Sequence, residues 1–370
     1  MSALGPIRVL VIDDSAFSRR TITRMLEASP LVRVIDWAHD GEEALRKTLE
    51  QEPDLVTLDL EMPRMDGFTF LRLLLARRPT PVLVISGRAH SQDVFKALDL
   101  GAVDFIAKPT PRAAPELESI QEELLRKVHA LRQLRMDKLR ERLASAPDLL
   151  PRRPAPASPA ARRVVAIGAS TGGPAAVTQV LGAFTEPPPF AVVVSQHMPG
   201  GFTASFAERI DRFTAFSARE AREGDRLEPG RVLVSPGGCH IEFGTYDGEP
   251  RVRLVPRSPG DKYTPSVDRM FVSAAKHFGA DLMAVVLTGM GDDGAQGVRA
   301  VKEAGGTVVT ESEESAVVFG MPQQAIRTGA VDAVLPLARI AGAIDAGLAG
   351  AAAARPPGGR RRRTPERGDA

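Results

Sequence analysis

The chain has 370 residues, of which 43% are hydrophobic and 25% charged, and its formal net charge is +2. This length suits two domains better than one core, and the composition is typical of a water-soluble globular protein. A near-neutral charge gives no indication of nucleic acid as a partner. The lone cysteine, Cys239, excludes an intrachain disulfide and a cysteine-rich metal site, which favours a cytoplasmic location. We expect no export signal and no membrane insertion, because every apolar run is shorter than the roughly 20 residues that cross a bilayer.

In the first third of the chain, short apolar runs alternate with amphipathic segments of helix length. The runs cover residues 9–12, 32–35, 55–58, 82–85 and 103–106, and the expected helices cover 16–28, 41–50, 68–77 and 92–100. A fifth helix is expected from about residue 115. This alternation predicts an α/β domain of the (βα)5 type, with a doubly wound parallel sheet, over residues 6–130.

Strand-end polar residues mark a candidate site in this first domain. Asp13 and Asp14 follow the first run, Asp59 the third, Ser86 the fourth and Lys108 the fifth. Because clustered carboxylates repel one another, they favour a hard divalent cation such as Mg²⁺. A neighbouring lysine and a serine hydroxyl suit phosphoryl oxygens, so the pattern predicts metal-assisted phosphoryl transfer to Asp59.

The same residues resemble a response-regulator receiver domain. The resemblance rests on residues 11–15 (VIDDS), 58–63 (LDLEMP), Ser86 and 108–109 (KP). It implies that a histidine kinase phosphorylates Asp59 and that Asp14, Asp59 and the Glu61 carbonyl bind Mg²⁺, with Asp13 nearby. It also implies that Phe105 holds the aromatic switch position.

Residues 131–161 are expected to form a linker between the domains. The fifth helix, with apolar residues at helical spacing, is expected to run on to about residue 143 as a stalk. Residues 147–161 are rich in proline, alanine and arginine, a composition that favours extended chain. A basic tail with four consecutive arginines, residues 351–370, is expected to be disordered.

A second α/β domain is expected over residues 162–350. Buried runs at 164–167, 190–194 and 282–287 indicate mostly parallel strands, and runs at 232–235, 241–245 and 251–255 indicate an antiparallel hairpin insert. The first run leads to Ser170 in a G-x-S-x-G turn, the second to His197, and the third to Asp292 and Asp293. Because parallel strands end at one edge, these residues predict a nucleophile, its base and an orienting carboxylate that transfer an acyl group to water.

The residues alone leave two choices open. His240 and His277 compete with His197, which we favour because it ends a buried strand parallel to the strand before Ser170. Spacing does not separate Asp292 from Asp293. A glycine turn in which Ser170 merely caps a helix is the structural alternative for the serine motif.

Five motifs resemble the catalytic domain of CheB-family protein-glutamate methylesterases. They are residues 169–173 (ASTGG), 196–199 (QHMP), 265–268 (PSVD), 287–294 (LTGMGDDG) and 316–322 (AVVFGMP). The resemblance implies a Ser170, His197 and Asp293 triad without a metal for the ester step, and backbone N–H groups of His197 and Met290 as the oxyanion hole. The implied activity is phosphorylation-activated hydrolysis of chemoreceptor glutamate methyl esters, with deamidation of receptor glutamines.

Two other classes of function remain as alternatives. A regulator that acts by binding DNA or protein lacks a compact helix-turn-helix pattern. A nucleotide-binding module lacks a complete G-x-G-x-x-G or P-loop motif.

Overall fold

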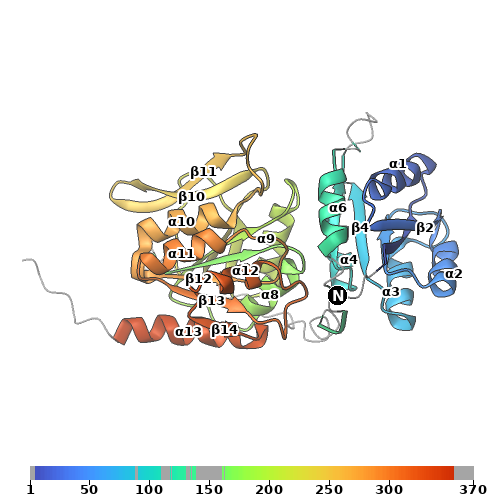
Figure 1. Ribbon diagram of the computed structural model, residues 1–370. Coiled ribbons are helices and arrows are strands. Elements are labelled where there is room, and N and C mark those ends of the chain that lie inside the picture. Colours follow the sequence, from blue (N-terminus) through green and yellow to red (C-terminus); the bar gives the residue numbers. More distant parts are fainter. Residues whose placement is uncertain are drawn as a thin grey trace, which may run out of the picture.

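The computed structural model describes residues 5–87, 91–109, 117, 119–130, 134, 136–138, 161 and 163–353. The chain forms two α/β domains, each built on its own parallel sheet, that lie side by side (Figure 1). No helix among the described residues is both long and apolar enough to cross a membrane.

The first domain is the expected (βα)5 unit. Its parallel sheet has the order β2-β1-β3-β4-β5. The strands are β1 Ile7–Ile12, β2 Val32–Ala38, β3 Leu55–Leu58, β4 Val82–Gly87 and β5 Asp104–Lys108. The helices are α1 Ala16–Glu27, α2 Gly41–Gln51, α3 Gly67–Arg77, α4 Ser91–Asp99 and α6 Gln121–Ala130.

Local polar contacts set where the first-domain helices begin. Ser15, Asp40 and Asp66 precede α1, α2 and α3, and each side chain accepts a backbone N–H from the first turn. Such caps satisfy N–H groups that have no partner within the helix. Ser15, Asp40 and Asp66 therefore cap these three helices, and the strand-end residues Asp13, Asp14 and Asp59 do not.

The helix α6 is shorter than the sequence predicts. The prediction of one continuous stalk helix to about residue 143 is wrong, since Leu134 lies outside any helix, although residues 136–138 are helical. The apolar face of α6 is buried in the first domain, where Leu124 and Val128 are fully covered, and Leu134 and Met136 pack against the same cluster. Burial of this apolar face keeps the segment on its own domain rather than letting it project as a stalk.

The second domain has a seven-stranded parallel sheet of order β14-β13-β12-β6-β7-β9-β8. Its strands are β6 Val164–Ala169, β7 Ala191–Gln196, β8 Ser217–Glu220, β9 Arg231–Val234, β12 Leu282–Val286, β13 Thr307–Glu311 and β14 Ala333–Leu335. Its helices are α8 Gly173–Gly182, α9 Thr203–Phe213, α10 Val267–Phe278, α11 Ala295–Glu303, α12 Met321–Arg327 and α13 Leu337–Ala353, with a 3-10 turn at Gly279–Asp281. Every residue of the central strands β6, β7 and β12 is buried, as expected for a sheet covered on both faces.

The antiparallel insert is confirmed in part. Strands β10 Cys239–Tyr246 and β11 Glu249–Pro256 form a two-stranded hairpin separate from the main sheet. The apolar run at 232–235 does not belong to this hairpin as expected. It forms β9, which pairs in parallel with β7 and β8, because its three buried residues complete the main core.

The structure describes only part of the expected linker, residues 131–161, and of the expected tail, residues 351–370. Helix α13 continues to Ala353, because its alanine-rich end favours helix, so the tail expected from residue 351 is helical over its first three residues. The rest of that tail and residues 139–160 of the linker lie outside the described residues. The domain boundaries remain predictions.

The two domains contact each other through the β5, α4 and α6 side of the first domain (Figure 1). Phe105 of β5 packs on Phe202 with ring centroids 4.6 Å apart, and Phe95 of α4 stacks on Phe206 of α9 at 6.0 Å. Arg209 adds two hydrogen bonds to the Asp99 carboxylate, of 2.6 and 2.5 Å. The contact is therefore aromatic at its centre and charged at its rim.

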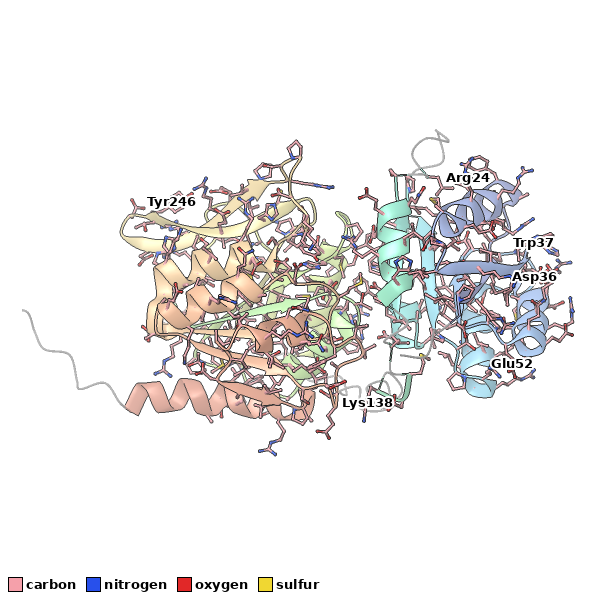
Figure 2. The ribbon with its side chains drawn as sticks, viewed as in Figure 1. Arg24, Asp36, Trp37, Glu52, Lys138 and Tyr246 are labelled. Carbon is pink, nitrogen blue, oxygen red and sulfur yellow. The ribbon has the colours of Figure 1, made fainter. Side chains whose placement is uncertain are left out.

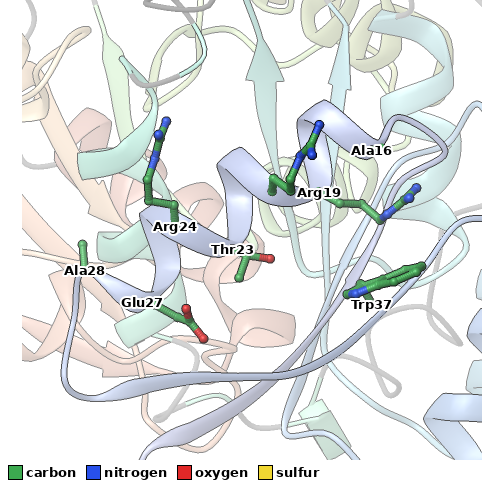
Figure 3. A pocket seen from close by; sticks show the side chains of 8 residues that line it. Ala16, Arg19, Thr23, Arg24, Glu27, Ala28 and Trp37 are labelled. Atoms are coloured by element: carbon green, nitrogen blue, oxygen red, sulfur yellow. The ribbon is translucent and has the colours of Figure 1, made fainter.

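The opposite side of the first domain faces away from the second. Arg24, Asp36, Trp37 and Glu52 lie on this outer side (Figure 2). A hollow of about 880 Å³ lies between α1 and β2, bordered by arginines and by Trp37, which is 48% exposed (Figure 3). Arg19 reaches from this hollow to the backbone oxygens of Asp13 and Asp14, at 2.7 and 3.0 Å.

Candidate functional sites

Ser170 lies in a tight turn between a central strand and a helix. Strand β6 ends at Ala169, and Gly172 takes φ +76° just before α8, a conformation that glycine adopts without strain. The Ser170 N–H donates to Thr288 O at 3.1 Å, and Ser170 O accepts the Gly173 N–H at 2.8 Å. No side-chain hydrogen bond caps α8, so the capping alternative for Ser170 is not supported.

The loop that carries Gly289 and Met290 lies directly against this turn. A Cβ atom at Gly289 would stand 2.7 Å from Ser170 Cβ and 2.5 Å from the Met321 sulfur. Only glycine allows so close an approach. Gly289, the residue before Met290, therefore lies directly against the serine.

His197 and Asp293 form the expected pair. The His197 side chain is within hydrogen-bond distance of Asp293, with Nε2 2.7 Å from Oδ2, and both groups are largely buried. An ionised carboxylate accepts only, so Nε2 carries a proton and Nδ1 of the neutral ring keeps its lone pair. Nδ1 is therefore the nitrogen available as a base.

Asp293 is fully supplied with donors at the start of α10. Besides His197, it accepts the Ser266 hydroxyl at 3.0 Å and the N–H groups of Val267 and Asp268 at 2.7 and 2.8 Å. Burial alone would raise the pKa of Asp293, but the hydrogen bond and charge of His197 and these backbone donors outweigh it and lower that pKa. Asp293 therefore stays ionised and orients the imidazole.

Asp292 has a different environment. Its Oδ1 accepts Lys262 Nζ at 2.7 Å and the Tyr263 hydroxyl at 3.0 Å, and its side chain is 58% exposed. The structure thus separates two adjacent aspartates that spacing alone does not distinguish. Only Asp293 contacts the imidazole.

A second oxyanion donor is expected from the backbone of His197. Its N–H donates to Ala169 O at 3.1 Å, because the β6–β7 ladder continues one residue past the strand. In this arrangement the N–H already has a backbone partner, and its oxyanion role stays a prediction. Met290 remains the other predicted donor.

The other two histidines of the domain have structural partners. His240 is fully buried, with Nε2 2.8 Å from Asp261 and Nδ1 accepting the Ser266 N–H at 3.1 Å. His277 Nδ1 lies 2.9 Å from the Ser273 carbonyl within α10. Neither contacts Asp293, so the preference for His197 fits the geometry.

The first domain gathers its strand-end acids into one cluster. Carboxylate oxygens of Asp13, Asp14 and Asp59 lie within 4.8 Å of one another. Lys108 Nζ donates to Asp13 Oδ2 at 2.7 Å and also to Asp59. Glu61 N–H donates to Asp59 Oδ1 at 3.3 Å. Ser86 is buried at the end of β4, next to β5.

The electrostatics of this cluster fit a divalent cation. Burial raises the pKa of Asp13, and the neighbouring charge of Asp59 adds to the rise although Lys108 opposes it. Burial would lower the pKa of Lys108, yet Asp59 and Asp13 together raise it. One lysine therefore faces more carboxylate charge than it balances, and an all-oxygen donor set of this kind suits Mg²⁺.

A receiver residue contacts the turn of the candidate nucleophile. Thr171, the neighbour of Ser170, donates its hydroxyl to Asp104 Oδ2 at 2.6 Å. The other oxygen of Asp104 accepts Lys127 Nζ at 3.0 Å, and Lys127 also donates to the Phe105 carbonyl. The expected switch residue, Phe105, is therefore part of the contact with the second domain.

Several residues of the two sites could not be recognised from the sequence alone. Thr171, Ser266 and Tyr263 have no individual signal, although Thr171 and Ser266 lie in motifs that were identified. Ser266 caps α10 and also donates its hydroxyl to Asp293. A serine before a predicted helix was the only available clue.

Comparison with known proteins shows to which family the chain belongs. The CheB methylesterase family profile matches residues 165–344, and the response regulator receiver domain profile matches residues 9–118. A protein-glutamate methylesterase/protein-glutamine glutaminase of Myxococcus xanthus is 52% identical over 94% of this chain and 98% of its own. The chain belongs to the CheB methylesterase/glutaminase family.

A second relative gives the same result. A Geobacter sulfurreducens protein with the same description is 50% identical, over 90% of this chain and 95% of its own. The crystal structure of the Thermotoga maritima CheB methylesterase catalytic domain is 38% identical and covers 49% of this chain and 95% of that domain, with a TM-score of 0.46. Membership in the CheB family confirms the expected enzyme class, a receiver joined to a methylesterase, and does not favour the DNA-binding or nucleotide-binding alternatives.

Proposed function

We propose that Ser170, His197 and Asp293 hydrolyse glutamate γ-methyl esters on chemoreceptors. The observation that carries this assignment is the 2.7 Å contact between His197 Nε2 and Asp293, at the same sheet edge as the Ser170 turn. An orienting carboxylate, an imidazole and a serine in a tight turn are the groups that acyl transfer to water requires. The names of the relatives support the substrate class.

We propose a role for each nitrogen of His197, supported by the contact of Nε2 with Asp293. Nδ1 takes the proton of the Ser170 hydroxyl as Oγ forms a bond to the ester carbonyl carbon. The carbon–methoxide bond then breaks, and the imidazolium returns the proton to give methanol and an acyl-enzyme. Water, deprotonated by Nδ1, attacks this acyl-enzyme and releases the glutamate carboxylate and Ser170. A glutamine amide reacts in the same way and releases ammonia.

Charge that develops on the carbonyl oxygen needs a donor beside Ser170. The Met290 N–H is our proposed donor, because the missing side chain of Gly289 lets its peptide approach the serine. Asp293 stabilises the imidazolium that forms in the same step. The ester step uses no metal in this scheme.

We propose that Asp59 of the receiver accepts a phosphoryl group from a histidine kinase. The carboxylates of Asp14 and Asp59 and the Glu61 carbonyl would hold Mg²⁺, which neutralises phosphoryl charge when bound. Lys108 supplies a fixed positive charge to the phosphoryl oxygens, and Ser86 a hydroxyl. A histidine kinase as phosphodonor and Mg²⁺ as metal are consistent with a cytoplasmic location, which we propose for this protein.

We further propose that the receiver restrains the esterase until Asp59 is phosphorylated. Thr171 is held by Asp104 from the receiver, and Phe202, five residues after His197, is covered by Phe105. A receptor helix needs access to this side of the catalytic domain. Phosphorylation therefore activates by shifting the domains toward an open arrangement.

A methanol-release assay on methylated receptor membranes, with and without a small phosphodonor and Mg²⁺, tests both parts. Ser170→Ala should abolish release under both conditions. Asp59→Asn should keep the basal rate and lose the stimulation by phosphodonor. Release by Ser170→Ala near the wild-type rate contradicts the proposed nucleophile, whereas full stimulation of Asp59→Asn contradicts the proposed phosphorylation site.

A further inference from the structure

Tyr263 lies flat against the imidazole of His197. The two rings are 4.8 Å apart between centroids, and their planes differ by 7°. Asp293 contacts the same imidazole at its edge, through Nε2. The ring of His197 is therefore held in two different directions by two residues.

Tyr263 is itself fixed in place by the loop that carries the aspartates. Its hydroxyl donates to Asp292 at 3.0 Å, and Lys262 donates to the same carboxylate oxygen at 2.7 Å. The hydrogen bond from Lys262 lowers the pKa of Asp292, so this acceptor is ionised at neutral pH. Burial raises the pKa of the Tyr263 phenol, so the donor keeps its proton.

A glycine makes room for this arrangement. Gly291 has φ +91°, and a Cβ atom there would stand 2.2 Å from the Tyr263 hydroxyl oxygen. A residue with a side chain is disfavoured here for two reasons: it rarely adopts this positive φ, and its Cβ atom would collide with Tyr263. Gly291 therefore serves the position of Tyr263 as well as the path of the loop.

Tyr263 also separates the imidazole from an open hollow. A cavity of about 530 Å³ is lined by Tyr263 together with Asp292, Asp293 and Asp268. Because Tyr263 both lines this space and stacks on His197, its removal would extend the hollow onto the face of the imidazole. Water would then reach a face that the phenol ring now covers.

The single hydrogen bond from Nε2 to Asp293 does not by itself stop the His197 imidazole from rotating about the axis of that bond. The contact with Asp293 fixes Nε2, but the direction in which Nδ1 points depends on the plane of the ring. A parallel aromatic neighbour restricts that plane, and its electron-rich face favours an imidazolium over a neutral imidazole.

We propose that Tyr263 is a positioning residue that sets the plane of the His197 imidazole, and that Asp292 and Lys262 hold Tyr263 in that role. The proposal rests on the proposed function of His197 as the base for Ser170. It gives Asp292, the exposed member of the aspartate pair, a task distinct from that of Asp293.

The test compares two substitutions of Tyr263 in the full-length, phosphodonor-activated protein. Tyr263→Leu removes the aromatic face and should lower kcat for methanol release about tenfold, with KM within about twofold. Tyr263→Phe keeps the face and should retain kcat within about threefold. The matched control is Tyr246→Leu, because Tyr246, the only other tyrosine, lies at the end of β10 in the hairpin, where its hydroxyl donates to Glu223. It should behave like wild type.

The pH profile separates positioning from loss of fold. The charged and titratable groups around the imidazole are Asp293, Asp268 beyond it, and Tyr263 with its partners Asp292 and Lys262. Because only Tyr263→Leu takes the aromatic face from the imidazole, the acidic limb of kcat/KM should shift in Tyr263→Leu and stay in place in Tyr263→Phe. Thermal melts of all variants report whether they fold.

A measurement without substrate separates this proposal from the function on which it rests. The low-field proton resonance of the His197 Nε2–H, identified by its loss in His197→Gln, should be sharp in wild type and broadened by exchange in a folded Tyr263→Leu protein. Wild-type kcat, pH profile and resonance in Tyr263→Leu would overturn the proposal. Equal losses in Tyr263→Phe would also overturn it, because they assign the effect to the hydroxyl. Absence of methanol release by the wild-type protein would contradict the proposed function instead.

Discussion

Both candidate sites lie where parallel strands end, but their charges are balanced in different ways. In the receiver, three carboxylates are clustered, Lys108 donates to two of them, and the pKa of Asp13 is raised mainly by burial. In the catalytic domain, one carboxylate, Asp293, has four donors and a lowered pKa. The same topological position thus carries an excess of negative charge in one domain and a compensated charge in the other.

This difference matches what each site has to do. An undercompensated cluster attracts a cation and changes its neighbours when a phosphoryl group arrives. A compensated carboxylate keeps one geometry and one charge throughout a reaction cycle, which is what orienting a histidine requires. Fold alone therefore predicts where the sites lie, and the local donors decide their chemistry.

The strongest test of this comparison removes the compensated charge. Asp293→Asn should lower kcat for methanol release by roughly 10³–10⁴, because an amide no longer stabilises the imidazolium and favours the wrong tautomer. The same change at Asp13 should act on phosphodonor stimulation rather than on basal release. Stopped assays of methanol release for both variants check this, and similar losses of basal rate in the two would refute the distinction.

An intermediate effect is expected at the contact between the domains. Arg209→Ala removes both hydrogen bonds to Asp99, which is half exposed, so the closed arrangement should weaken by about 0.5–1 kcal/mol. Basal methanol release without phosphodonor should rise about two- to fivefold. Arg226→Ala, which removes an exposed ion pair with Glu249 on the hairpin, is the control. An unchanged basal rate in Arg209→Ala would show that this pair does not restrain the enzyme.

An effect on stability, with little change in activity, is expected from a carboxyl group beside the compensated one. Burial, with the nearby charge of Asp293, raises the pKa of Asp268 to about 6. The folded state thus holds a proton that the unfolded chain has already released, so this group's contribution to stability is present below about pH 4 and is lost as the pH rises through about 6. Asp268→Asn should remove this loss, on the order of 1–2 kcal/mol above pH 7. Denaturant unfolding at pH 5 and 7.5 measures it, and equal pH slopes in both proteins would argue against it.

The sequence predicted the parts of the fold that depend on regular patterns. Alternating apolar and amphipathic segments were sufficient for both parallel sheets, and strand-end polar residues located Ser170, His197 and the receiver acids. The run at 232–235 was misassigned because its apolar residues fit a hairpin and a parallel edge strand equally well. Partner strands are set by contacts that are distant in sequence.

The site details that were missed depend on backbone direction and packing. The N–H of His197 points into the sheet ladder, which no motif encodes. Tyr263 contacts His197 across a distance of 66 positions in the chain, so only the folded structure brings the two rings together. The choice between Asp292 and Asp293 required the family resemblance at first, and the geometry now gives it a physical reason.

The hydrogen bond between Thr171 and Asp104 bears on how strongly a signal can be amplified. If the restrained form is favoured about 100 to 1 at rest, the output cannot rise more than about 100-fold, however completely Asp59 is modified. A tighter contact would lower background turnover but demand more free energy from the phosphoryl group, about 5.5 kcal/mol to invert a 99:1 ratio. The number of polar contacts across this surface therefore sets both the basal turnover of the unphosphorylated protein and the largest increase that phosphorylation can produce.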